Sequence, residues 1–116
     1  MKILILEDME HARANIHEFL TLIGHESIPL DTSIDLAATL DRVRPEAILL
    51  FFRTPLQAEF NWNLLAGCRS YPTIVVGSDG PQERDGALAR GARVYLLKPF
   101  RLQALEAAIA SLEGLD

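Results

Sequence analysis

The segment from Pro45 to Pro55 constrains the fold of this chain more than any other. It is an apolar run, with no charged residue between Glu46 and Arg53. A continuous apolar run, unlike an alternating one, predicts a strand that is buried on both faces. Such a strand lies inside a parallel sheet with helices on both sides. The C-terminal end of this strand should therefore face the crevice where open α/β sheets bind ligands. The residues at that end are Phe51, Phe52 and Arg53.

Three further apolar runs predict strands, at residues 2–6, 72–76 and 94–97, and residues 25–30 predict a shorter, more polar strand, as expected near a sheet edge. Between the runs, apolar side chains recur at helical spacing. This spacing predicts helices over residues 9–23, 34–43, 57–69, 81–91 and 102–112. Asp8 is expected to cap the first helix. Gly86 is expected to cost the fourth helix about 1 kcal/mol relative to alanine, which would make it the least stable helix.

The predicted elements alternate strictly between strand and helix, and Thr54 and Pro55 are expected to end the central strand. This alternation predicts a parallel sheet with right-handed crossovers. Five strands in 116 residues favour the flavodoxin-like doubly wound α/β fold over a longer nucleotide-binding fold. The expected strand order is 2-1-3-4-5.

Composition narrows the class of protein. A chain of 116 residues is long enough for one domain, which we expect to span residues 1–116. The net charge of −5 and the lack of a Lys/Arg cluster argue against direct nucleic-acid binding. No run is long enough to span a membrane, and no signal peptide is recognisable. The chain has a single cysteine, Cys68, which excludes an internal disulfide and fits a reducing cytoplasm. We interpret Cys68 as a small buried apolar residue.

Polar residues gather where the predicted strands end, at one edge of the sheet. A carboxylate pair that faces a lysine there could hold Mg²⁺ and a phosphate group. The residues at the strand ends are Glu7 and Asp8 (first strand), Phe51 and Arg53 (third), Gly77 and Ser78 (fourth) and Lys98 (fifth).

Four segments in this order resemble the receiver domains of two-component response regulators, over nearly the whole chain. They are Ile3–Asp8, Pro45–Pro55, Pro72–Val76 and Gly91–Phe100. The resemblance implies that an aspartate after the third strand accepts a phosphoryl group from a histidine kinase, with Mg²⁺ bound by the acidic pair. It also implies that a Ser or Thr after the fourth strand reports the phosphate, that an aromatic residue of the fifth strand then changes rotamer, and that the Lys98–Pro99 peptide bond is cis.

The chain departs from the family where this chemistry takes place. Phe51 occupies the acceptor position, and phenylalanine has no nucleophile and no carboxylate for the metal. Gly77 stands at the hydroxyl position, and Arg53 lies where the family directs a backbone carbonyl toward the metal. Ser78 carries a hydroxyl, but strand alternation predicts that its side chain faces away. The sequence therefore predicts an atypical receiver that works without phosphorylation.

Each altered position leaves two interpretations open. Glu7 and Asp8 are weak candidates for a metal site, and the favoured alternative is that Lys98 and Arg53 pair with them directly. Phe51 either locks the pocket or replaced the acceptor after its use was lost. Tyr95 is either a two-position switch or, as favoured, a side chain fixed in one rotamer, because Gly77 offers it no hydroxyl to follow.

The predicted function is regulation through protein–protein contacts in signalling or transcription control, without catalysis or a cofactor. The partner is expected to be another protein, an attached output domain or a second copy, which would bind the face formed by the fourth helix, fifth strand and last helix. Candidate residues on that face are Arg84, Arg90, Arg93, Tyr95, Arg101 and Glu106. The alternative is a sensor that binds a small ligand or metal in the altered pocket. The chain is expected to be either a whole protein or the N-terminal part of a longer regulator.

Overall fold

The computed structural model describes residues 1–53 and 57–113 of the chain. Strands and helices alternate as predicted, with ends that differ by a few residues. Thr54 and Pro55, which were expected to end the central strand, lie outside the described residues. The elements are β1 (Lys2–Leu6), α1 (Glu10–Leu22), β2 (Glu26–Leu30), α2 (Leu36–Val43), β3 (Ala47–Phe51), α3 (Ala58–Gly67), β4 (Thr73–Gly77), α4 (Pro81–Ala89), β5 (Val94–Leu97) and α5 (Leu102–Glu113).

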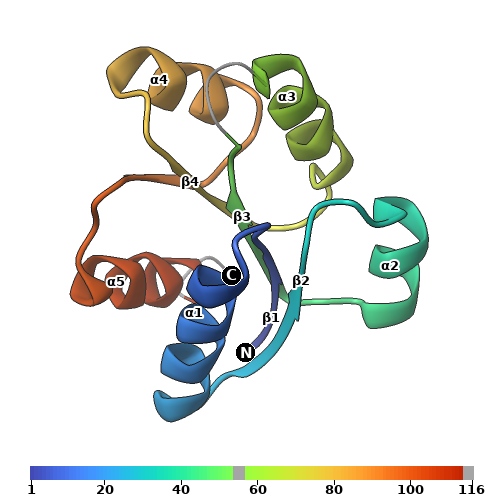
Figure 1. The fold of residues 1–116 in the computed structure, drawn as a ribbon, viewed down its shortest axis with the longest axis vertical. Helices are drawn as coiled ribbons and strands as arrows, with labels where there is room; N and C mark the ends of the chain where they lie inside the picture. Colours follow the sequence, from blue (N-terminus) through green and yellow to red (C-terminus); the bar gives the residue numbers. More distant parts are fainter. Residues whose placement is uncertain (54–56, 114–116) are drawn as a thin grey trace.

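The five strands form one parallel sheet in the order β2-β1-β3-β4-β5, which confirms the predicted flavodoxin-like topology (Figure 1). β3 lies at the centre, where Leu49 pairs with Ile5 of β1 and with Ile74 of β4. Every residue of β3 is buried. This complete burial is what its unbroken apolar sequence predicts.

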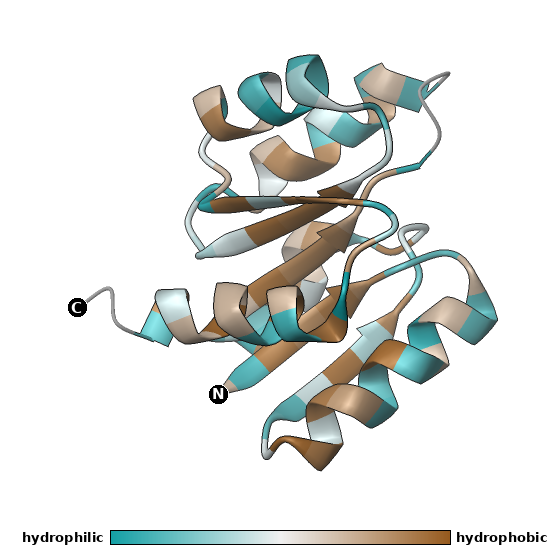
Figure 2. Cartoon of the chain, turned by 90° about the vertical axis from the view of Figure 1, so that its left-hand side faces the viewer, coloured by the Kyte–Doolittle hydropathy of each residue, from teal (hydrophilic) through white to brown (hydrophobic). Residues whose placement is uncertain are grey.

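The two faces of the sheet carry separate cores. α1 and α5 cover one face, where Ile16 of α1 and Ile109 of α5 pack against β1 and β3. α2, α3 and α4 cover the other face, where Leu40 and Leu65 pack against the same strands. Figure 2 shows the central strands as mostly hydrophobic, between helices of mixed hydropathy. Within residues 1–53 and 57–113, no helix is long and apolar enough to cross a membrane.

The first helix begins differently from the prediction. Met9, not Asp8, is the N-cap residue of α1, and it makes no side-chain capping bond. Oδ1 of Asp8 instead accepts hydrogen bonds from the backbone N–H and the hydroxyl of Thr32, at 2.7 and 2.6 Å. The expectation for Asp8 was wrong because Thr32, which follows the neighbouring strand β2, supplies donors that the sequence near Asp8 does not reveal.

Gly86 in α4 has a packing role that its helix propensity does not predict. A Cβ atom at this position would lie 3.0 Å from Cη2 of Trp62 in α3. Cζ of Arg90 lies 4.0 Å from the centroid of the same Trp62 ring. The glycine therefore lets α3 and α4 approach each other, and the low stability expected of α4 stays a prediction.

Cys68 is fully buried, as interpreted from the sequence. Burial raises the pKa of its thiol to about 12. The thiolate, which is the reactive form, is therefore scarce at neutral pH, and Cys68 serves as a core residue.

Candidate functional site

The residues at the strand ends meet at the carboxyl edge of the sheet, as predicted. All of them except Gly77 line a cavity of about 310 Å³, whose lining includes Glu7, Asp8, Phe51, Arg53, Ser78 and Lys98. We call this cavity the strand-end pocket. The expectation that Ser78 faces away from the site was wrong, since Ser78 lies one residue beyond β4, where strand alternation no longer applies.

Arg53 and Asp8 form an ion pair in the strand-end pocket. Nε of Arg53 donates to Oδ2 of Asp8 at 2.6 Å, and Nη2 donates to the hydroxyl of Thr32 at 2.8 Å. A third donor, Nη1, reaches Oε1 of Gln57 at 2.9 Å, and the guanidinium lies 3.8 Å from the ring centroid of Phe60. Both oxygens of Asp8 thus have donors, which agrees with the favoured ion-pair interpretation.

Asn61 holds the backbone of Arg53 in place. Its Oδ1 accepts from the Arg53 N–H at 2.9 Å, and its Nδ2 donates to the Arg53 carbonyl at 3.0 Å. Asn61 is buried, so these bonds satisfy an amide that would otherwise be costly inside the protein. The carbonyl that the family resemblance assigns to the metal is therefore already bonded to a side chain.

The environment of Asp8 changes its titration. Burial alone would raise the pKa of this carboxyl. Hydrogen bonds from Thr32 and the guanidinium of Arg53 outweigh burial and hold the pKa below its usual value. The ionised form of Asp8 is thus the one that the folded protein stabilises.

Glu7 pairs with Lys98 more loosely. Nζ of Lys98 lies 3.9 Å from Oε2 of Glu7, which confirms the predicted salt-bridge distance. Oε1 of Glu7 accepts from the N–H of Met9 at 3.0 Å. Among the described residues, Oε2 has no hydrogen-bond donor, although the side chain of Glu7 is only 5% exposed. Lys98 neutralises this oxygen without hydrogen bonding to it.

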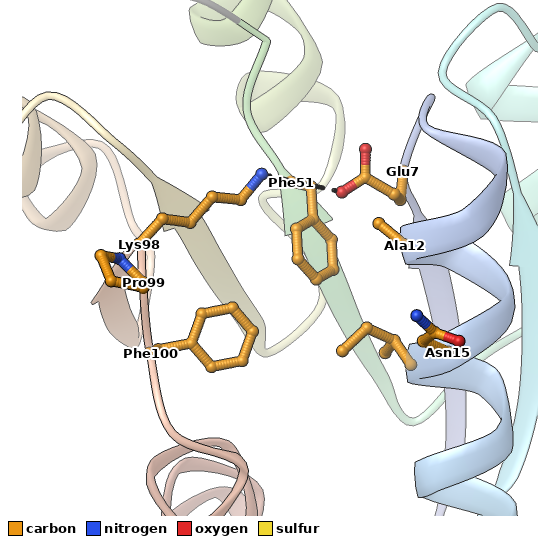
Figure 3. Close-up of a pocket in the computed structure, with 8 residues that line it drawn as sticks. Glu7, Ala12, Asn15, Phe51, Lys98, Pro99 and Phe100 are labelled. Atoms are coloured by element: carbon orange, nitrogen blue, oxygen red, sulfur yellow. Dashed lines mark ion pairs between the residues drawn. The ribbon is translucent and has the colours of Figure 1, made fainter.

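Phe51 forms the apolar floor that both interpretations of this residue require. Its ring is almost fully buried and lies 6.3 Å from the ring of Phe100, centroid to centroid. Figure 3 shows the ring between Phe100 on one side and α1 on the other, below the Lys98–Glu7 pair. Nζ of Lys98 lies 5.4 Å from the ring centroid. The assignment of Phe51 to the acceptor position stays a prediction.

Two side chains fill the space that Gly77 leaves. Oη of Tyr95 donates to Oε1 of Glu83 at 2.5 Å, and both oxygens lie where a Cβ atom on Gly77 would stand. Burial, together with the Glu83 carboxylate, raises the pKa of the Tyr95 hydroxyl. Tyr95 is therefore bonded to α4 in the rotamer seen here, which supports the interpretation that it is fixed.

The residues present do not fit the Mg²⁺ that the resemblance implies. Asp8 is saturated by Arg53 and Thr32, Phe51 supplies no oxygen, and the Arg53 carbonyl is bonded to Asn61. Mg²⁺ requires near-octahedral oxygen ligation. Among the residues that the structure describes, no three His, Cys, Asp or Glu side chains form a group that could hold a metal ion.

The candidate interface residues on α4, β5 and α5 differ in the contacts that they make. Arg84, Arg93, Arg101 and Glu106 are not buried, and Arg84 pairs with Asp85 at 3.3 Å. The guanidinium of Arg90 instead stacks on Trp62, on the α3 side of α4.

Three residues that shape the site were missed from the sequence: Thr32, Asn61 and Glu83. Asparagine is a poor helix former. The unfavourable propensity of Asn61 inside α3 was the one available signal that its side chain has another role.

We expect Lys98→Met to lower the free energy of unfolding by about 1–2 kcal/mol, because Glu7 would keep a buried charge without a cation. Partial exposure of Lys98 keeps the value below that of a fully buried pair. Urea denaturation measures the effect, with the exposed Arg101→Met as control. Adding Glu7→Gln to Lys98→Met should recover part of the loss, and an unchanged midpoint for Lys98→Met would contradict this account.

The lowered pKa of Asp8 predicts a pH dependence. Asp8 stabilises the folded state fully above the ordinary carboxyl pKa of about 3.9, and this contribution is lost as pH falls through the lower folded-state pKa. Asp8→Asn should therefore be less stable than the unaltered chain at pH 7, and the difference should shrink below about pH 4. Thermal unfolding of both, with Glu18→Gln as a surface control, measures this; a difference that stays constant into acid would refute it.

Comparisons with known proteins agree with this geometry. No family model matches the chain. It is 28% identical over 120 residues to the transcriptional regulatory protein YxdJ of Bacillus subtilis, a match that covers 95% of this chain and 49% of that protein. The chain therefore spans about half the length of the curated relative that it matches.

Solved structures resemble it over almost its full length. The receiver domain of the sensor histidine kinase PA1611 from Pseudomonas aeruginosa, with a magnesium ion coordinated in its active-site cleft, superposes with a TM-score of 0.80 at 24% identity, covering 97% of both chains. The N-terminal domain of the nisin resistance regulator NsrR gives a TM-score of 0.77 at 23% identity, covering 96% of both. The chain thus has the fold of the response-regulator receiver domains that its sequence resembles.

Proposed function

We propose that this chain is a receiver-like regulatory domain that works without phosphorylation. It acts in signal transduction or transcription control inside the cytoplasm through protein–protein contacts and catalyses no reaction. The proposal draws on the receiver fold and on the names of the similar proteins. The observation that carries it is Phe51, whose buried ring closes the carboxyl end of β3.

An acyl phosphate needs a carboxylate in the pocket, and no acid among the described residues takes the place of Phe51. Glu46 lies at the opposite end of β3, where its Oε1 accepts from the N–H of Lys2 at 2.8 Å. Glu59 lies on α3 with an exposed side chain. Glu7 and Asp8 follow β1 and are bonded as described above. The described part of the pocket therefore offers no replacement acceptor at the end of β3.

A fixed conformation also supports the proposal. In a phosphorylation switch, the aromatic residue of the fifth strand must move when the phosphate arrives. Here Tyr95 is bonded to Glu83, and the position that would carry the reporting hydroxyl is Gly77. The domain therefore holds one arrangement of α4 and β5 without a phosphate signal.

The contact surface that we propose is the face formed by α4, β5 and α5. β5 is an edge strand of the described sheet, with β4 as its neighbour. Leu97 and Leu102 are 48% and 45% exposed beside the charged Arg101. An apolar pair next to charged residues suits a protein partner, either an attached output domain or a second copy of this chain.

Amide NMR titration with Mg²⁺, followed by Mg²⁺ plus beryllofluoride, tests phosphorylation independence. We expect no saturating shift at Glu7, Asp8, Phe51 or Lys98. A variant that combines Phe51→Asp with Arg53→Met restores a carboxylate and removes the competing cation, and it serves as the positive control. Saturating shifts in the unaltered chain would overturn the proposal.

The fixed rotamer of Tyr95 gives a second prediction. Gly77→Ala places a methyl group where the Tyr95 and Glu83 oxygens lie, so it should destabilise the domain by about 1–3 kcal/mol and shift the Tyr95 ring resonances. Adding Glu83→Ala should reduce the cost, because it empties the same space. Equal costs in both backgrounds would show that Glu83 and Tyr95 do not hold this space.

A further inference from the structure

A second cavity lies beside the strand-end pocket, between α1 and the loop that joins β5 to α5 (Figure 3). We call it the α1 cleft. Its volume is about 560 Å³, which is within the range of small-molecule sites. Most of its lining is apolar, from Ala12, Ile16, Phe51, Pro99 and Phe100; the polar residues of its lining are Glu7, Asn15 and Lys98.

The α1 cleft contains an unsatisfied buried acceptor. Oε2 of Glu7 has no hydrogen-bond donor within residues 1–53 and 57–113, although its carboxylate is about as buried as the core. Lys98 stands 3.9 Å away, beyond hydrogen-bond distance. A buried carboxylate oxygen without a donor is costly, and a charged donor satisfies it best. The oxygen therefore marks a place where an external donor would be stabilised.

The chemistry of the cleft narrows the class of donor. A divalent metal does not fit, because Asp8 and the Arg53 carbonyl already have other partners. An anion would face the carboxylate of Glu7. A cation on an apolar body would gain both the carboxylate and the aromatic rings of Phe51 and Phe100.

We propose that the α1 cleft binds a small organic amine. Its primary ammonium group donates to Oε2 of Glu7, and its apolar or aromatic body packs against Ile16, Phe51 and Phe100. Lys98 is 40% exposed, so its head group can turn to solvent when the ligand's ammonium replaces it. This inference goes beyond the proposed regulatory function and would add a ligand input to it.

The test uses 2-phenylethylamine as the probe and amide NMR of the whole chain as the readout. We expect saturating shifts at Ala12, Phe51 and Phe100. 3-Phenylpropionate has the same ring with an acid in place of the amine, and it should not compete. Mg²⁺ alone serves as the metal probe and should not shift Glu7.

Two variants separate the parts of the site. Glu7→Gln keeps the shape of the side chain but removes the charge, and it should weaken amine binding at least about tenfold. Ala12→Leu fills the apolar part of the cleft and should also weaken binding while leaving Glu7 unchanged. Glu18→Gln, on the exposed side of α1, is the matched control and should bind as the unaltered chain does.

Three results would overturn the proposal. They are an absence of saturation at millimolar amine, equal binding of amine and acid, and a saturating Mg²⁺ shift at Glu7. Amine affinity that Glu7→Gln leaves unchanged would equally contradict it, provided that the variant's NMR spectrum shows it folded. The Mg²⁺ shift at Glu7 would also count against phosphorylation independence, whereas the results with the amine and the acid bear on the α1 cleft alone.

Discussion

Neutralising the two acids at the end of β1 is the constraint on which the strand-end pocket depends. Glu7 and Asp8 are adjacent at the carboxyl edge of the sheet, and adjacent carboxylates repel each other unless cations are near. Arg53 supplies one cation with direct hydrogen bonds, and Lys98 supplies the other at 3.9 Å. The protein thus neutralises both acids with its own side chains.

The residues at this edge of the sheet are closely packed by other side chains. Phe51 packs against Phe100, and the oxygens of Glu83 and Tyr95 fill the space beside Gly77. Asn61 bonds to both backbone groups of Arg53. Close packing of this kind favours one conformation, because each group would lose its partner in another arrangement. That is the physical basis for the proposed regulation by contact in place of regulation by phosphate.

Glu7 is the exception to this closure. Its carboxylate is buried, but one oxygen lacks a donor among the described residues, and Glu7 lines the apolar α1 cleft. In the two proposals, the strand-end pocket keeps the fold in one conformation, and the neighbouring α1 cleft is where a ligand would act on the domain.

The sequence by itself determined the order of the elements, the strand order and the burial of β3. These follow from local patterns, namely unbroken apolar runs for buried strands and helical spacing between them. It also identified Phe51, Gly77, Arg53 and Lys98 as the residues of interest at the strand ends, since the resemblance is read position by position. The identities of the residues along the chain were enough to predict the fold and to select these strand-end positions.

Only the tertiary structure decided which partners these residues have. The bonds of Arg53 to Asp8 and of Tyr95 to Glu83 join residues 45 and 12 positions apart. Asp8 looked like a helix cap because a local pattern does not include Thr32, 24 residues away. Partner choice between distant groups depends on the packing of the whole sheet, and no local pattern contains that information.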